Sequence, residues 1–419
     1  MVKLALLFPG QGSQYVGMGR RLTEQFPAVR QVFEEADDVL GFPLTGLCFE
    51  GDMATLTRTE NAQPAILTVS VAAFGAYMQE FAVEPAAGAG HSLGEYSALV
   101  CAGALPFAHA LKIVHQRGRF MQQAVKSGAG AMAAISDVDI DVVEAACAEV
   151  RVPGQWVTVS NDNAPRQAVI SGHKDAVSRT ADILETRGAR VTALDVSAPF
   201  HTPLMAGAAG QLREVLETYG HHLEDPRWPV LANVTARAYE HPGQITDYLS
   251  RQMTEPVRWR ECLHWLEAQG IDLVLELGPK KVLRNLTGKN SARMTAYAFD
   301  VEADRQAFAR VLHHRFTTII RRSLALAAAT KNRNWNRDEY RQGVILPYQR
   351  IKQMALDLEA HGRRPTLDQA NQAAEMLRSV LHTKKAPPTE QQKRLHRLFD
   401  HPKDRSHRSP TLSSPVPKF

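Results

Sequence analysis

The stretch GAGHSLGEYSA, residues 88–98, places Ser92 between two glycines in the pattern G-x-S-x-G. The small-residue segment EPAAGAG before it (84–90) is typical of a buried strand, and LGEYSALVCAGAL after it (93–105) is typical of a helix. A strand, a sharp turn with serine at its tip and a helix form a nucleophile elbow, in which the glycines let strand and helix approach closely. The stretch therefore predicts an α/β protein with Ser92 raised at the end of a strand.

The segments before this turn continue the alternation of strands and helices. The run KLALLFPG (3–10) is continuously apolar after its lysine and is stopped by a Pro-Gly pair, which predicts a short buried strand. Residues 60–81 carry apolar side chains around the whole helical period, as a helix enclosed by a core would. Together with the turn at Ser92, these segments predict an α/β-hydrolase-like core with a parallel sheet.

Residues 130–196 have a different rhythm. A strand-like run is followed by a helix-like run, two strands around a turn at 163–165, a helix closed by Gly188 and a last strand. This βαββαβ order is the signature of a ferredoxin-like module. We expect this module to be an insert in the main body, because the sequence character of VSAPFHTPLM (196–205) is again that of the segments before residue 130.

Start signals predict two helices beyond residue 314. Thr366 is followed three residues later by Gln369, and Thr389 by Gln392, and each threonine comes directly after a proline. Behind the first signal, an apolar stripe repeats at helical spacing and consists of Leu367, Ala370, Ala374, Leu377 and Leu381. The final segment, rich in proline, serine, histidine and basic residues, is typical of disorder.

We therefore expect the chain to have four parts. These are a catalytic core at 1–127 and 197–310, a ferredoxin-like subdomain at 128–196, a helical extension at 311–400 and a disordered tail at 401–419. Residues 311–419 carry 21 Lys and Arg against 9 Asp and Glu, which leaves the first 310 residues at −7 within a whole-chain net charge of +5. The basic part would attract an acidic partner, but its acids are interspersed and its aromatic residues sparse, which argues against nucleic acid.

Composition also limits the location and the chemistry. The chain has no run of 18 uncharged apolar residues, and its N-terminal apolar run is too short for a signal sequence, so we expect a cytoplasmic protein without a membrane partner. The four cysteines lie far apart without a CxxC pair. We expect them to be reduced, buried thiols rather than metal ligands.

A serine nucleophile needs a base within reach and N–H donors for the oxyanion. The helix that follows Ser92 would leave the N–H of Leu93 unpaired beside the hydroxyl. His201 is the candidate base, because APFHTPLM holds it between two prolines on a loop that follows a strand. Taken alone, a histidine on such a loop is more often structural than catalytic.

Seven stretches, in order over residues 1–310, closely resemble the malonyl-CoA:acyl-carrier-protein transacylases. They are FPGQGSQYVGMG (8–19), NAQPAIL (61–67), GHSLGEYSALVCAGAL (90–105), QRGRFMQ (116–122), NDNAPRQAVISG (161–172), SAPFHTPLM (197–205) and EPVRW (255–259). The family has the architecture that the residues predict, an elbow-bearing core with an inserted ferredoxin-like module. The resemblance leaves about 110 residues beyond it, and a discrete transacylase that serves a polyketide synthase is one setting in which such an extension would fit.

The resemblance implies roles for nine residues. Ser92 would be acylated by malonyl-CoA, with His201 as its base, and the N–H groups of Gln11 and Leu93 would form the oxyanion hole. Arg117 would pair with the free carboxylate of malonate through its planar fork, although without the family it would be assigned to a solvated helix face. The substrate site would also include Gln63, His91, Phe200 and Gln252, with Phe200 favouring malonyl over branched units and the backbone near Gln252 orienting His201.

The resemblance thus implies malonyl transfer from coenzyme A to an acyl carrier protein, by a ping-pong reaction, in fatty acid or polyketide synthesis. No cofactor is expected, because malonyl-CoA and coenzyme A are substrate and product. We expect a monomer that meets the carrier protein transiently. Two alternatives are a hydrolase that releases stalled acyl groups from carrier proteins, which would gain nothing from a buried Arg117, and a non-catalytic docking protein.

Overall fold

The computed structural model describes residues 3–399 except 125–128 and 197. The chain divides into two compact units, one of residues 3–309 and one that begins at Arg310. The disordered tail expected at 401–419 lies outside the described residues. None of the helices in the described part of the chain is long and apolar enough to cross a membrane.

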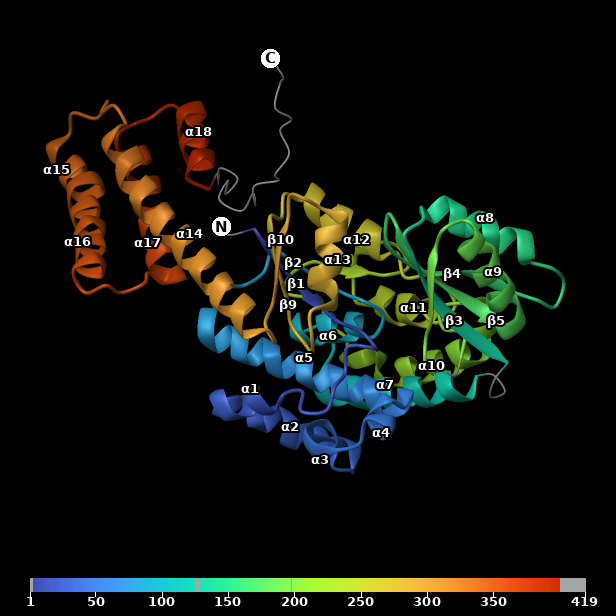
Figure 1. Ribbon diagram of the computed structural model, residues 1–419. Helices are drawn as coiled ribbons and strands as arrows, with labels where there is room; N and C mark the ends of the chain where they lie inside the picture. Colours follow the sequence, from blue (N-terminus) through green and yellow to red (C-terminus); the bar gives the residue numbers. More distant parts are fainter. Residues whose placement is uncertain (1–2, 125–128, 197, 400–419) are drawn as a thin grey trace, which may run out of the picture. The chain divides into compact units, whose positions relative to one another are not determined.

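The first unit is built on a six-stranded sheet, drawn in Figure 1. The strand order is β10 (Thr295–Ala298), β9 (Leu273–Glu276), β1 (Leu4–Phe8), β2 (Ala87–Gly90), β7 (Val230–Ala232) and β8 (Arg237–Ala238). All neighbours pair in parallel except β7 and β8, which are antiparallel. The predicted α/β class and parallel sheet are confirmed.

The helices of this unit surround the sheet. They are α1 (Arg20–Gln25), α2 (Pro27–Leu40), α3 (Leu44–Glu50), α4 (Met53–Thr57), α5 (Thr59–Phe81), α6 (Leu93–Cys101), α7 (Phe107–Gln123), α10 (Ala206–Tyr219), α11 (Gly243–Arg251), α12 (Trp259–Ala268) and α13 (Val282–Asn290). The strand expected near residues 3–8 and the buried helix expected over 60–81 are therefore present as β1 and α5.

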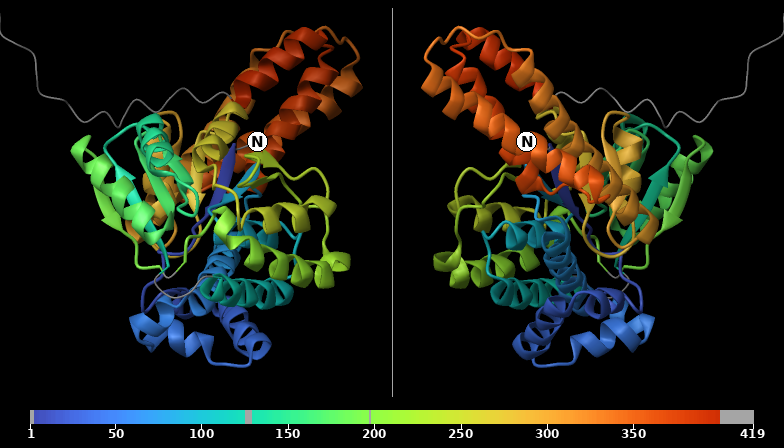
Figure 2. Two further views of the ribbon diagram at one scale, coloured as in Figure 1. Left: turned by 90° about the vertical axis from the view of Figure 1, so that its right-hand side faces the viewer. Right: turned by 90° about the vertical axis from the view of Figure 1, so that its left-hand side faces the viewer.

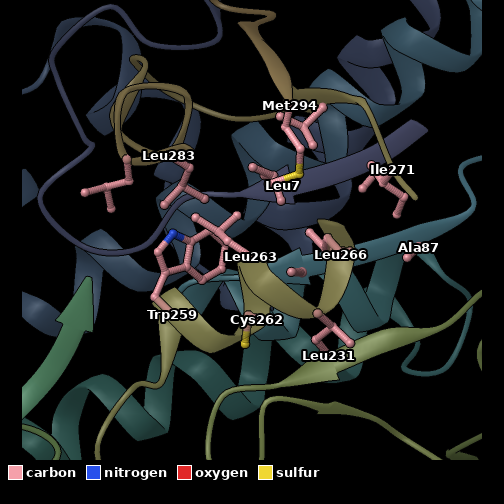
Figure 3. Packing of buried hydrophobic residues seen from close by; sticks show 14 of the residues in the cluster. Leu7, Ala87, Leu231, Trp259, Cys262, Leu263, Leu266, Ile271, Leu283 and Met294 are labelled. Carbon is pink, nitrogen blue, oxygen red and sulfur yellow. The ribbon is translucent and has the colours of Figure 1, made fainter. Parts of the chain in front are cut away.

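Strand β1 lies at the centre of the sheet and is buried on both faces, as expected for a strand covered by helices on either side. One face of the sheet packs against α12 and α13, as Figure 3 shows. There the side chains of Trp259, Leu263 and Leu283 lie over Leu7 and Leu231. Each fully buried side chain of this size contributes about 1.5–3 kcal/mol to the hydrophobic stabilisation.

A second, separate sheet is antiparallel and four-stranded, with the order β4-β5-β3-β6. Its elements follow the chain as β3 (Gly130–Ser136), α8 (Ile140–Val150), β4 (Val157–Ala164), β5 (Gln167–His173), α9 (Lys174–Thr186) and β6 (Arg190–Ala193). The turn expected at 163–165 is wrong in position, because Asn163 and Ala164 belong to β4 and Ala164 pairs with Gln167. Irregular register in β4 lets these residues continue the ladder.

The second unit is helical. Its helices, which run side by side in Figure 2, are α14 (Glu302–Ala328, which contains the boundary at 310), α15 (Arg337–Tyr340), α16 (Leu346–Ala360), α17 (Leu367–Thr383) and α18 (Pro388–Phe399), with a π-helical segment at Arg341–Ile345. The cap expected at Thr366 is confirmed. The Thr366 hydroxyl accepts from the backbone N–H of Gln369, and the Gln369 side-chain oxygen accepts from the backbone N–H of Thr366. Ala370, Ala374, Leu377 and Leu381 of the predicted stripe are buried, whereas Leu367 is half-exposed.

The second predicted cap is wrong. Helix α18 begins at Pro388, so Thr389 lies inside the helix. Proline is favoured at the first helical position, because its φ is already helical and its missing N–H is not needed there. Pro388 therefore starts the helix one residue before the threonine.

The four cysteines are free and buried, as predicted. Burial raises the pKa of each thiol, for example that of Cys48 to about 12.

Candidate active site

Ser92 lies in a tight turn between β2 and α6, at the carboxyl end of the central strands, where open α/β sheets form their clefts. Its φ of 52° is a strained value for a residue with a side chain. A Cβ on Gly90 would lie 1.9 Å from the backbone of Gly94, and a Cβ on Gly94 would lie 1.9 Å from the carbonyl oxygen of Phe8. The two glycines therefore let strand and helix touch, and the turn lifts the Ser92 hydroxyl.

The Ser92 hydroxyl lies next to His201. Ser92 Oγ is 2.8 Å from His201 Nε2, and His201 Nδ1 is 2.7 Å from the backbone carbonyl oxygen of Gln252. A carbonyl only accepts, so Nδ1 carries the proton and Nε2 is left to accept from the serine O–H. Gln252 caps the C-terminal end of α11, where carbonyls lack partners within the helix.

The environment keeps the His201 imidazole neutral. Only 3% of the residue is exposed. Burial and the nearby Arg117 cation lower the pKa of His201 to about 3, partly opposed by the bond to Gln252. A neutral imidazole with a free Nε2 can accept a proton from a nucleophile.

Arg117, on α7, brings a cation to the same place. It is 1% exposed, and its Nη2 donates to Ser92 Oγ at 3.2 Å and to Gln252 Oε1 at 2.8 Å. Its Nη1 donates to Gln63 Oε1 at 2.8 Å, and the guanidinium lies over the ring of Tyr96. Its Nε has no hydrogen-bond partner among the described residues, and none of their carboxylates is within ion-pair distance. A buried cation without a contacting anion is costly unless a ligand supplies one.

Gln63, on α5, completes the wall beside Arg117. It is fully buried, and its Nε2 lies 3.2 Å from Met121 Sδ. Phe200 precedes His201 in the chain and is 6% exposed. Gln63 therefore belongs to the buried surroundings of Ser92 through Arg117, and Phe200 is a buried neighbour of His201 in the chain.

His91 directly precedes Ser92 in the chain. Its Nε2 is 2.8 Å from Asn163 Oδ1 of the second sheet, and its ring meets Trp259 edge to face at 5.5 Å. Burial lowers the pKa of His91. The structure thus gives His91 partners in the second sheet and α12, and no hydrogen bond from it to Ser92.

Two backbone amides near the turn, those of Gln11 and Leu93, are candidate donors to a ligand. Leu93 is the first residue of α6, and Gln11 follows β1 in a loop fixed by the bond from Ser13 Oγ to the Gly10 carbonyl, 2.7 Å. A Cβ on Gly10 would lie 2.4 Å from the His91 carbonyl oxygen, so the two backbones are in contact. Neither the Gln11 nor the Leu93 amide donates to another described residue.

Two polar residues at this site were missed by sequence reasoning. Asn233, directly after β7, accepts the Ser92 N–H at Oδ1, 2.7 Å, and donates from Nδ2 to the Gly90 carbonyl, 2.7 Å. Glu95 is fully buried on α6 and accepts from Gln252 Nε2 at 2.7 Å. A lone carboxylate within the apolar run 93–105 was the signal for Glu95, whereas Asn233 carried none.

The chain is similar to known proteins in both sequence and structure. Residues 5–298 match the family model described as an acyl transferase domain. The chain is 46% identical over 304 residues to a malonyl CoA-acyl carrier protein transacylase of Bacillus subtilis, covering 73% of this chain and 76% of the relative. It is 42% identical over 301 residues to the transacylase of Escherichia coli, covering 72% and 96%.

Two solved structures show the same relationship. An acyl carrier protein S-malonyltransferase from Vibrio cholerae aligns with a TM-score of 0.69 and 44% identity, over 73% of this chain and 99% of that one. A malonyl-transacylase in complex with its type II polyketide synthase acyl-carrier protein aligns with a TM-score of 0.70 and 42% identity, over 72% and 97%. Both alignments leave about a quarter of the chain unmatched.

Proposed function

The chain belongs to the malonyl-CoA:acyl-carrier-protein transacylase family, and on that premise we propose how its residues carry out the reaction. It is an acyltransferase that moves malonyl from malonyl-CoA to the phosphopantetheine thiol of an acyl carrier protein, for fatty acid or polyketide synthesis. Acyl transfer through a serine splits the reaction into two steps with a covalent intermediate between them.

In the first step, Ser92 attacks the thioester carbonyl of malonyl-CoA while its proton passes to His201 Nε2. The N–H groups of Gln11 and Leu93 stabilise the oxyanion, since neither donates to another residue in the described part of the chain. The C–S bond then breaks, and the coenzyme A sulfur leaves with the proton from His201. The product is a malonyl ester on Ser92.

In the second step, the carrier-protein thiol gives its proton to His201 Nε2 and attacks the ester carbonyl. The ester bond breaks and Ser92 recovers the proton from His201, so the enzyme returns to its starting state. His201 acts in both directions because its Nδ1 stays bound to the Gln252 carbonyl, which holds the tautomer with Nε2 free.

The malonyl assignment rests on the environment of the buried Arg117 side chain. Among the residues that the structure describes, no carboxylate contacts this buried guanidinium, which lies 3.2 Å from the Ser92 hydroxyl, and none accepts from its Nε. The far carboxylate of malonate would supply the missing anion, held by the planar fork of the guanidinium. Gln63 and Gln252 fix that fork by accepting from its two Nη atoms. Hydrolysis of uncharged acyl groups would leave this buried cation without a function, so it is not favoured.

Phe200 and His91 take supporting roles in this proposal. The buried ring of Phe200, beside the base, would leave little room for an α-methyl group and so would favour malonyl over methylmalonyl. His91 would line the substrate site from the Asn163 side.

Two architectural assignments belong to the same proposal. The strained turn between β2 and α6 has the form of a nucleophile elbow on an α/β-hydrolase-like core, which is supported by the φ of Ser92 and the close packing of Gly90 and Gly94. The second sheet with α8 and α9 has the strand order of a ferredoxin-like subdomain.

The acyl carrier protein is the transient partner. Carrier proteins are usually acidic, so the basic balance beyond residue 310 offers complementary charge, while the same charge on a solvated helix face would only aid solubility. We also propose that the protein acts as a monomer in the cytoplasm, without a cofactor and without binding nucleic acid or a membrane.

Incubation with malonyl-CoA and a carrier protein bearing its phosphopantetheine arm tests the function. Mass spectrometry should find malonyl on the carrier, and its appearance should require both substrates. A carrier that stays unmodified while the malonyl ester is hydrolysed would favour the hydrolase instead.

A further inference from the structure

A second buried charge lies one turn after the nucleophile and takes no part in the two steps above. The Glu95 side chain, on α6, is fully buried and accepts three hydrogen bonds. The Tyr239 hydroxyl donates to Oε1, the Gln252 Nε2 donates to Oε2 at 2.7 Å, and the Asn233 backbone N–H donates to Oε2 at 2.9 Å. All three partners are donors, so this pocket is matched to an ionised carboxylate.

Two of these partners connect Glu95 to the atoms of the reaction. Asn233 accepts the Ser92 N–H and donates to the Gly90 carbonyl, so it holds both ends of the strained turn. Gln252 accepts from Arg117 at its side chain and from His201 at its carbonyl. Ser92, His201 and Arg117 are therefore all hydrogen-bonded to Asn233 or Gln252. Both of these residues also donate to Glu95.

The Gln252 amide shows why a carboxylate is needed here. Its Nε2 faces Glu95 and its Oε1 faces the Arg117 guanidinium. Turned over, the amide would point its oxygen at the carboxylate and its N–H groups at the cation, and both contacts would be repulsive. An anion on one side and a cation on the other thus leave the amide a single orientation.

We propose that Glu95 is a positioning residue for the transfer reaction, which in its ionised form orients Gln252 and Asn233 and through them Ser92, His201 and Arg117. The inference rests on the proposed function, since it assigns Glu95 a role in that same site. Glu95 also lies near enough to Arg117 for a favourable electrostatic interaction, although the two do not form an ion pair.

The role makes the site sensitive to the ionisation of Glu95. Burial raises the pKa of Glu95 to about 7, against the pull of its three donors and of Arg117 on α7. The other titratable groups that face it are Tyr239, the neighbouring Tyr96 and Cys262 of α12. A proton on Glu95 must displace one donor, because all its partners donate. His201, with its pKa lowered to about 3, titrates too far below to cause the same effect.

The test is the pH dependence of malonyl-enzyme formation, followed by rapid quench and intact-protein mass spectrometry. In the wild type the acylation rate should fall as the pH drops through about 7. Glu95→Gln has nearly the same shape but cannot ionise, so its acylation rate should be lower than the wild-type plateau, by about tenfold at most. The fall in rate near pH 7, the acid limb of the profile, should be absent in this variant. Glu276→Gln is the matched control: Glu276 is also buried with a raised pKa, but it accepts from the Arg284 backbone N–H rather than from a site residue. Its acid limb should coincide with that of the wild type.

Tyr239→Phe provides a second, independent variant in case Glu95→Gln folds poorly. Because the Tyr239 hydroxyl lowers the pKa of Glu95, its removal should move the acid limb to higher pH. A merely structural role would not shift the limb upward in one variant and abolish it in the other. The proposal is overturned if the limb stays in place in Tyr239→Phe, or persists unchanged in Glu95→Gln. If the wild type forms no malonyl-enzyme at any pH, the proposed function fails instead.

Discussion

The Oγ atom of Ser92 lies 2.8 Å from the Nε2 atom of His201, although 109 positions separate the two residues in the chain. Both have positive φ angles, 52° and 59°, which residues with side chains rarely adopt. Two strained residues that meet at one hydrogen bond are held there by their surroundings, here a strand-to-helix turn and a proline-flanked loop. The contact therefore has the form of a pre-organised nucleophile and base.

Replacement of the base should slow acylation without preventing folding. His201→Ala removes the proton acceptor of Ser92, and general-base catalysis contributes about 10²–10⁴-fold to such reactions. The rate of acylation by malonyl-CoA is measured by rapid quench. His264→Ala, an exposed histidine on α12, serves as the control and should keep the wild-type rate. A His201→Ala enzyme as fast as this control would remove His201 from the reaction.

Replacement of the cation should change selectivity as well as rate. Arg117→Ala should damage malonyl transfer while acetyl loading, relative to malonyl, increases, because only malonyl carries the second carboxylate. Arg119→Ala is the matched control, since Arg119 lies two positions away on α7 and is exposed. Competition between malonyl- and acetyl-CoA gives the ratio directly. An equal fall of both activities in Arg117→Ala would show that it does not clamp the carboxylate.

Phe200 should set a preference between malonyl and its α-methyl analogue. A methyl group in a pocket is worth about 1–3 kcal/mol, so Phe200→Ala should raise loading of methylmalonyl relative to malonyl by about tenfold. Phe200→Leu, which leaves a smaller space, should give an intermediate ratio. Paired thioesters in one reaction, followed by mass spectrometry, measure it. An unchanged ratio in both variants would assign selectivity to other residues.

Local patterns explain which parts of the fold were predictable. Strand β1 and helix α5 follow from uninterrupted apolar runs, and the turn at Ser92 follows from its glycines, because each signal is contained within the element itself. The start of α18 was misplaced because Pro388 and Thr389 compete for the same boundary. Strand β4 continues past Asn163, which lies at a shift in register, because Ala164 still pairs with Gln167 of β5.

The site divides in the same way. The family motifs pointed to Ser92, His201, Arg117 and Gln252, and the structure brings the four together within hydrogen-bond contact. Asn233 lies 141 positions from the Ser92 amide that it holds, and such a contact depends on tertiary packing that leaves no local pattern. Glu95 stood within a motif, but the donors around it come from distant segments, so its role could be seen only in three dimensions.

Thr366 and Thr389 of the helical unit make a matched pair for stability. Thr366→Ala removes the side chain that accepts the Gln369 N–H at the start of α17, and loss of such a cap costs about 1 kcal/mol of unfolding free energy. Thr389→Ala changes an exposed position inside α18 and should cost less, because no cap is lost there. Denaturant unfolding followed by circular dichroism compares them. Equal losses would mean that the cap of α17 adds nothing.

The most direct test of the central claim is the intact mass of the protein after brief exposure to malonyl-, methylmalonyl- and acetyl-CoA. We predict that the wild type gains one malonyl group, that peptide mapping places it on Ser92, and that Ser92→Ala gains none. Ser97→Ala, a buried serine on the same helix, should acquire the group as the wild type does. A malonyl adduct that persists in Ser92→Ala would contradict the account.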